Sequence, residues 1–199
     1  VICCHGSGQG PHIDYWLPLM REISKHTKVL CYERRKIGQN TMAVSRSQTP
    51  EEAVSDLDAL LKALQLRPPY ILIAHSYGGA IARQFLQWHP TQVAGMVLAE
   101  TGQETPIKHE AEQYKKQILG SKPLSVIHAD SLLGKRGGST SAEELRLRDL
   151  WAAEDERLKR AQLGLSSNAR YVRVDDCGHD IIDERPHIVA AEVSWVLEN

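Results

Sequence analysis

The sequence has almost no excess of charge and no long hydrophobic run. Its 199 residues include 24 Lys and Arg against 25 Asp and Glu, for a formal net charge of −1. The densest basic run, Arg34-Arg35-Lys36, has no interleaved aromatic residues, so it predicts a solvated turn rather than a surface for nucleic acid. Because no apolar run is long enough to cross a bilayer, we also expect no membrane span.

Cysteine is scarce, and its spacing argues against a metal site. The four cysteines form no C-x-x-C pair and no other spacing typical of metal ligands. Three of them, Cys3, Cys4 and Cys31, fall in stretches that predict buried strands, where cysteine behaves as a small hydrophobic residue. We therefore expect no metal and a reducing, cytoplasmic compartment.

Internal repeats and low-complexity linkers are absent as well. The remaining composition, 42% hydrophobic and 25% charged, is typical of one globular domain with a real core. We expect a single domain over residues 1–199.

A serine stands at a predicted strand-to-helix turn in the middle of the chain. The apolar run 70–73 predicts a strand, the stretch 80–88 has a helical pattern, and Ser76 lies between them. A tight turn has no room for bulk two residues before and after the serine, and Ala74 and Gly78 meet that demand. This is the pattern of a nucleophile elbow. The alternative is a glycine pair that lets a strand pack on a helix, with Ser76 as a bystander.

A serine hydroxyl needs a base to become a nucleophile, and His179 is the candidate among nine histidines. The alternating pattern at 169–174 predicts a strand, and His179 follows it after a short loop. Gly178 allows this loop to turn sharply and to bring the imidazole over the edge of the sheet. A closing helix is expected from Asp183 to Leu197, with Val189, Val193 and Val196 on its apolar face.

Two carboxylates compete for the role of the acid that holds this histidine. Glu100 ends the apolar strand pattern 93–99, and Asp130 ends the pattern 124–129. Both respect the chain order serine, acid, histidine. Because a carboxylate at a strand end can also serve only to accept backbone N–H groups, the residues alone leave the choice open.

At this point the chain from Val1 to Leu197 resembles the α/β-hydrolase superfamily, and within it the AB hydrolase-1-like serine hydrolases. His5-Gly6-Ser7-Gly8 is similar to the oxyanion loop of that superfamily, and Tyr32-Glu33-Arg34 is similar to its Tyr-Asp-Arg turn. Relatives carry two strands before the oxyanion loop, so the resemblance implies that this chain lacks its N-terminal strands.

The resemblance also bears on the acid. In many members the acid falls where this chain has Leu132, two residues beyond Asp130. In other members it ends the preceding strand, and there Glu100 follows Ser76 by 24 residues. The resemblance therefore favours Glu100, with Asp130 second.

The chemistry that the resemblance implies is acyl transfer to water without a cofactor. Ser76 attacks an acyl carbon, His179 takes and returns the proton, and Glu100 orients the imidazole. The backbone N–H groups of Ser7 and Tyr77 hold the oxyanion. The expected partner is a small-molecule carboxylic ester or thioester, although perhydrolase and acyltransferase activity stay open. The alternative is a non-catalytic or slow-turnover ligand-binding or signalling module of the same fold.

The alternation of strand and helix patterns predicts an α/β fold with a mainly parallel sheet covered by helices on both faces. Thr49-Pro50-Glu51-Glu52 is a capping box that opens one helix. A charged helix is expected at 142–162, and the segment 101–122 is a possible small cap. The apolar stripe of the charged helix would be Leu147, Leu150, Trp151, Leu158 and Ala161, whereas Glu143, Glu144, Arg146, Arg148, Lys159 and Arg160 would face water.

Overall fold

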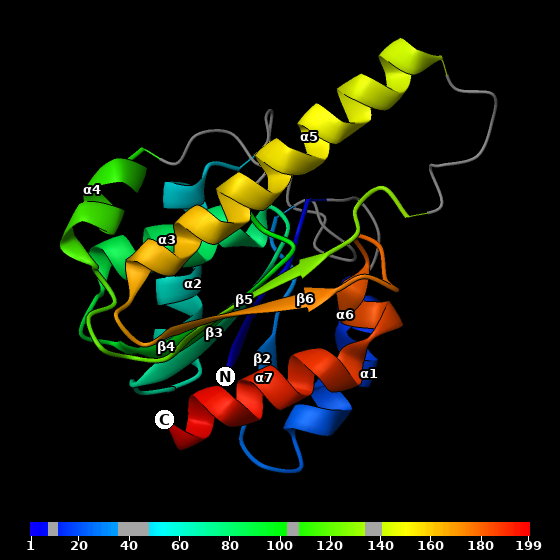
Figure 1. The fold of residues 1–199 in the computed structure, drawn as a ribbon. Helices are drawn as coiled ribbons and strands as arrows, with labels where there is room; N and C mark the ends of the chain where they lie inside the picture. The colour runs from blue at the N-terminus through cyan, green and yellow to red at the C-terminus, as the bar shows by residue number, and fades with distance from the viewer. Residues whose placement is uncertain (8–11, 36–47, 103–107, 134–140) are drawn as a thin grey trace.

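The computed structural model describes residues 1–7, 12–35, 48–102, 108–133 and 141–199 (Figure 1). Gly8 of the predicted oxyanion loop and Lys36 of the basic run lie outside these ranges. Within them, none of the helices combines the length and the apolar character needed to span a membrane.

In the described ranges, six strands form one sheet in the order β2-β1-β3-β4-β5-β6. They are β1 (Ile2–Cys4), β2 (Leu30–Cys31), β3 (Tyr70–His75), β4 (Val93–Ala99), β5 (Leu124–Ala129) and β6 (Ala169–Val174). Each neighbouring pair in this order runs parallel, which confirms the predicted sheet. Because parallel strands bring their carboxyl ends to one edge, the residues that follow β1, β3, β4 and β6 meet there.

Helices cover both faces of the sheet, as predicted (Figure 1). They are α1 (His12–Ile23), α2 (Pro50–Ala63), α3 (Gly78–Trp88), α4 (Glu110–Lys116), α5 (Ala142–Ala161), α6 (Ile181–Glu184) and α7 (Pro186–Glu198), with a 3₁₀ turn η1 (Gln162–Leu165). Alternate residues of β3 enter different cores, since Leu72 and Ala74 pack with α2 and α3, whereas Ile71 and Ile73 pack with α1, α6 and α7. The sheet is therefore buried on both sides.

The predicted capping box opens α2. The Thr49 hydroxyl accepts the Glu52 N–H at 3.3 Å, and the Glu52 carboxylate accepts the Thr49 N–H at 2.9 Å. Pro50 occupies the first turn, where its missing N–H costs nothing.

The single closing helix expected from Asp183 to Leu197 is wrong, because the chain forms two helices there. The short α6 ends at Glu184 and α7 begins at Pro186. Between them Arg185 has φ −136° and ψ 51°, which is not helical, and the residue before a proline is driven away from the helical region by the proline ring. The apolar face was predicted correctly, since Val189, Val193 and Val196 are buried.

The helix α5 forms as expected, and Glu143, Glu144, Arg146 and Arg160 are exposed as predicted, but the prediction of its buried face is wrong in part. Leu147, Leu150 and Trp151 are 43–59% exposed, and the amino-terminal half of α5 extends beyond the body of the molecule (Figure 1). The buried residues of α5 are Asp155 and Lys159, and Lys159 is 0% exposed rather than facing water. Charged side chains become buried only when partners compensate their lost hydration, and these partners come from distant strands.

Candidate active site

Ser76 occupies the sharp turn between β3 and α3. Its φ of 50° lies in the left-handed region, which a non-glycine residue adopts at an energetic cost. A Cβ at Gly78 would overlap the carbonyl oxygen of Cys4 on β1, so only glycine fits two residues after the serine. The turn leaves Ser76 half-buried at the N-terminus of α3, where the helix dipole favours negative charge.

The loop after β1 lies against this serine. A Cβ at Gly6 would stand 3.0 Å from the Cβ of Ser76, so the loop backbone approaches the serine closely. The buried Arg34 guanidinium donates to the carbonyl oxygens of His5 and Gly6, the latter at 2.7 Å. The His5 ring donates from Nδ1 to the Gly6 carbonyl at 2.9 Å. These bonds hold the backbone that leads into Ser7.

His179 and Glu100 meet at the carboxyl edge of the sheet. Nδ1 of His179 donates to Oε2 of Glu100 across 3.2 Å. The Asp130 carboxylate accepts the backbone N–H of Leu132 at 3.1 Å, within the turn that follows β5. Of the two candidate acids, Glu100 is thus the one found in hydrogen-bond contact with His179.

Glu100 is held in one orientation by several donors. It is 0% exposed and has φ 52°, a second left-handed residue at this edge of the sheet. Oε1 accepts the Ala129 N–H at 2.7 Å, Oε2 accepts the Ser131 hydroxyl, and Lys159 Nζ lies 3.4 Å from Oε1. Burial alone raises the pKa of this carboxyl, but His179, Lys159, Ser131 and Ala129 outweigh it and hold the pKa below its usual range. Glu100 is therefore a carboxylate at neutral pH.

His75, the residue before Ser76, connects the elbow to the loop of His179. Its Nε2 donates to the His179 carbonyl at 2.7 Å, and the two ring centroids are 4.8 Å apart. Since His75 directly precedes Ser76, this contact places His179 beside the elbow. Burial and the neighbouring His179 lower the pKa of His75 to about 4, so the ring is neutral at physiological pH.

The buried His75 should make the fold sensitive to mild acid. Because its folded-state pKa of about 4 lies below the ordinary value of 6.5, the unfolded chain takes up the proton first as the pH falls. The contribution is complete above pH 6.5 and is lost toward pH 4, by about 3 kcal/mol at about 1.4 kcal/mol per unit. Urea unfolding from pH 7 to pH 4 measures the free energy of unfolding of the wild type and of His75→Gln. The slope of this free energy against pH should be smaller in the variant.

The matched control is His26→Gln, at an exposed histidine of the α1–β2 connection. In this control, the free energy of unfolding should change with pH as steeply as it does in the wild type. Equal slopes for His75→Gln and the wild type would contradict a buried neutral histidine.

Part of the predicted cap segment packs on α3. The buried Arg83 of α3 donates to Gln113 at 3.0 Å, to Glu110 at 2.8 Å and to Tyr114 at 2.8 Å, all on α4. These bonds fix α4 beside α3. Residues 103–107 lie outside the described part of the chain, so the cap at 101–122 stays a prediction.

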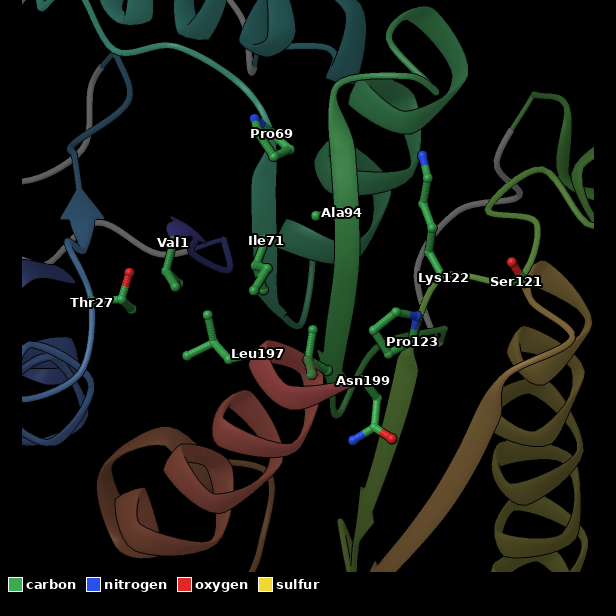
Figure 2. Close-up of a pocket in the computed structure, with 11 residues that line it drawn as sticks. Val1, Thr27, Pro69, Ile71, Ala94, Ser121, Lys122, Pro123, Leu197 and Asn199 are labelled. Atoms are coloured by element: carbon green, nitrogen blue, oxygen red, sulfur yellow. The ribbon is translucent and has the colours of Figure 1, made fainter.

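A pocket of about 490 Å³ lies at the amino ends of the strands (Figure 2). Ser76 follows the carboxyl end of β3. Pro69, Ala94 and Pro123 line the pocket at the amino ends of β3, β4 and β5, with Leu197 and Asn199 from the end of the chain. The candidate catalytic residues do not line this pocket. Among the residues that the structure describes, no group of three or more His, Cys, Asp or Glu side chains is arranged to hold a metal ion.

The sequence analysis did not predict the roles of three residues near the site. These are Arg34, which holds the loop after β1, His75 and Lys159. His75 and Arg34 adjoin the recognised motifs, so their positions along the chain were a usable signal. Lys159 carried no such signal, because Asp155 and Lys159 have the i, i+4 spacing of an ordinary exposed helix pair.

Comparison with known proteins agrees with the fold that carries these residues. Residues 1–161 match a family model described as the alpha/beta hydrolase fold. The chain is 27% identical over 205 residues to the uncharacterized protein YqjL of Bacillus subtilis, covering 92% of this chain and 78% of that protein. It is 24% identical to an AB hydrolase superfamily protein of Gibberella zeae, covering 92% and 82% of the two chains. A thermophilic esterase from Thermogutta terrifontis shares the fold, with a TM-score of 0.61 and 14% identity over 99% of this chain and 89% of the esterase.

Proposed function

The chain belongs to the alpha/beta hydrolase fold family, and from that premise we propose that it is a serine hydrolase that cleaves a carboxylic ester or thioester. The hydrolase class is supported by the family match and by the fold shared with an esterase. The observation that carries the finer proposal is the hydrogen bond of 3.2 Å between His179 and the buried Glu100, beside the left-handed turn at Ser76.

In the proposed reaction, His179 removes the proton of the Ser76 hydroxyl as Oγ attacks the acyl carbon. The imidazolium then donates this proton to the leaving alcohol or thiol, which leaves an acyl ester on Ser76. A water molecule, deprotonated by the same imidazole, releases the carboxylic acid and restores the serine. Glu100 accepts the Nδ1–H throughout, so that the free Nε2 faces the reacting proton, and its charge stabilises the imidazolium.

The oxyanion would be held by the backbone N–H groups of Ser7 and Tyr77. Tyr77 caps the start of α3, and Ser7 follows Gly6, which lies against the Ser76 side chain. The bonds from Arg34 and His5 to the Gly6 carbonyl support this arrangement, because donors stabilise a transition state best when they are already oriented.

A fluorophosphonate probe tests the proposal on the wild-type chain at pH 7–8. We expect one adduct per chain by intact mass, located by peptide mapping on Ser76, and hydrolysis of short-chain esters or thioesters by the unlabelled protein. Heat-denatured protein is the control and should take up no probe. A folded chain without an adduct at Ser76 would contradict the proposal and favour a ligand-binding or signalling module of the same fold.

A further inference from the structure

A lysine from α5 reaches the carboxylate that holds His179. Lys159 is 0% exposed, and its Nζ lies 3.4 Å from Glu100 Oε1 and 2.5 Å from Asp155 Oδ1. Asp155 lies one helical turn earlier on α5 and is also buried. One ammonium is therefore shared between two carboxylates, of which one contacts His179.

The second carboxylate is anchored to the sheet. Asp155 Oδ2 lies 3.0 Å from Nε2 of His128 on β5. The other ring nitrogen of His128, Nδ1, lies 2.9 Å from Nη1 of Arg173 on β6. The hydroxyl oxygen of Tyr171 lies 2.5 Å from the same Nδ1. Because an arginine only donates, Nδ1 of His128 is the acceptor, and the neutral ring donates from Nε2 to Asp155. His128 thus orients Asp155 and adds no charge.

We propose that Lys159 is a positioning residue for the triad, whose ammonium, divided between Asp155 and Glu100, sets the negative charge that Glu100 presents to His179. This inference rests on the proposed function, in which His179 carries a proton during the reaction.

The charges of the cluster match that role. At rest Glu100 and Asp155 carry two negative charges against the one positive charge of Lys159, which leaves a buried excess of one negative charge. An imidazolium at His179 cancels this excess. Without Asp155, the full positive charge of Lys159 would act on Glu100 and disfavour the imidazolium at His179. Without Lys159, the negative charges of two buried carboxylates would be uncompensated and would favour the imidazolium.

The position of this cluster argues against a role in packing alone. Burying an ion pair costs hydration that its attraction repays only in part, so apolar side chains would attach α5 to the sheet at least as well. Yet α5 leaves Leu147, Leu150 and Trp151 exposed and buries Asp155 and Lys159. The buried charges lie at the one point where α5 meets Glu100.

The test is the titration of the His179 imidazole followed by NMR in the wild type, Lys159→Met and Asp155→Asn. Removing the positive charge should move the titration midpoint up by about one pH unit, and removing the negative charge should move it down by a similar amount. The charged and titratable groups around His179 and its partners include Tyr15, His75, Glu100, His128, Asp155, Lys159, Tyr171, Arg173 and Asp180, and all but the substituted one are common to each comparison.

Opposite shifts support the proposal, because a loosened structure would move both variants in the same direction. Shifts of the same sign, or none, in folded variants would overturn it. Lys159→Arg, which keeps the charge, should restore the wild-type midpoint. If Lys159→Met does not fold, Asp155→Asn alone decides, since an unshifted or raised midpoint contradicts the proposal.

The NMR titration needs no turnover, so it separates this inference from the proposed function. In a chain that the fluorophosphonate does not label, opposite shifts would still establish the charge coupling of Lys159 to His179 while the hydrolase proposal fails. In an active chain, the acid limb of the pH profile of kcat/KM should shift up in Lys159→Met and down in Asp155→Asn. In both variants KM should change less than kcat.

Discussion

Replacement of Ser76 by alanine should lower kcat for ester or thioester hydrolysis by about 10⁶-fold. The substitution removes the only atom that can form the acyl-enzyme in the proposed reaction, while an alanine meets the same backbone demands as the serine at φ 50°. The free energy of unfolding should therefore change little. Steady-state kinetics with a short-chain ester, together with urea unfolding, measures both quantities.

A matched control is Ser24→Ala, because Ser24 is exposed and donates only to a backbone carbonyl of α1 at 3.1 Å. This variant should retain wild-type kcat. A Ser76→Ala enzyme that keeps kcat within tenfold of the wild type would mean that Ser76 is not the nucleophile.

Replacement of Glu100 by glutamine should lower kcat by about 10⁴-fold. The amide keeps the size of the side chain but loses the charge that stabilises the imidazolium, and its NH₂ group cannot accept the proton on Nδ1 of His179. The imidazole can then turn or change tautomer, so that Nε2 no longer serves as the base. Single-turnover kinetics with an activated ester measures the loss in the acylation step.

Asp130→Asn is the matched control for this second experiment, because it makes the same chemical change at the rival carboxylate. Asp130 accepts the Leu132 N–H, and an asparagine oxygen can replace that bond, so kcat should fall by less than about tenfold. The reverse order of losses would assign the acid to Asp130. Equal and small losses would mean that neither carboxylate orients His179.

The motifs around the site were predictable because each depends on local chain geometry. Ser76 sits at the junction of a buried strand and a helix, and that junction follows from the apolar run before it and the small residues around it. His179 follows the last strand of a parallel sheet for the same kind of reason. A choice between Glu100 and Asp130 was beyond local patterns, since both end a strand at the same edge.

The helix α5 shows where local patterns mislead. The helix itself was predicted at 142–162, and in the structure a capping box formed by Ser141 and Glu144 opens it. Its orientation was not predictable, because the apolar stripe predicts that Leu147, Leu150 and Trp151 are buried and these side chains are exposed. The face that is buried depends on Glu100 and His128, which lie on other elements.

The sequence by itself determined the parallel α/β fold, the turn that holds Ser76, and the shared edge to which Glu100 and His179 belong. These features follow from periodicity, small residues in turns and the common direction of the strands, all of which act over short stretches of chain. Only the tertiary structure decided which carboxylate contacts His179 and that Lys159 is buried against it. Such contacts join residues from separate elements, and the free energy of a buried charge depends on all of its neighbours at once.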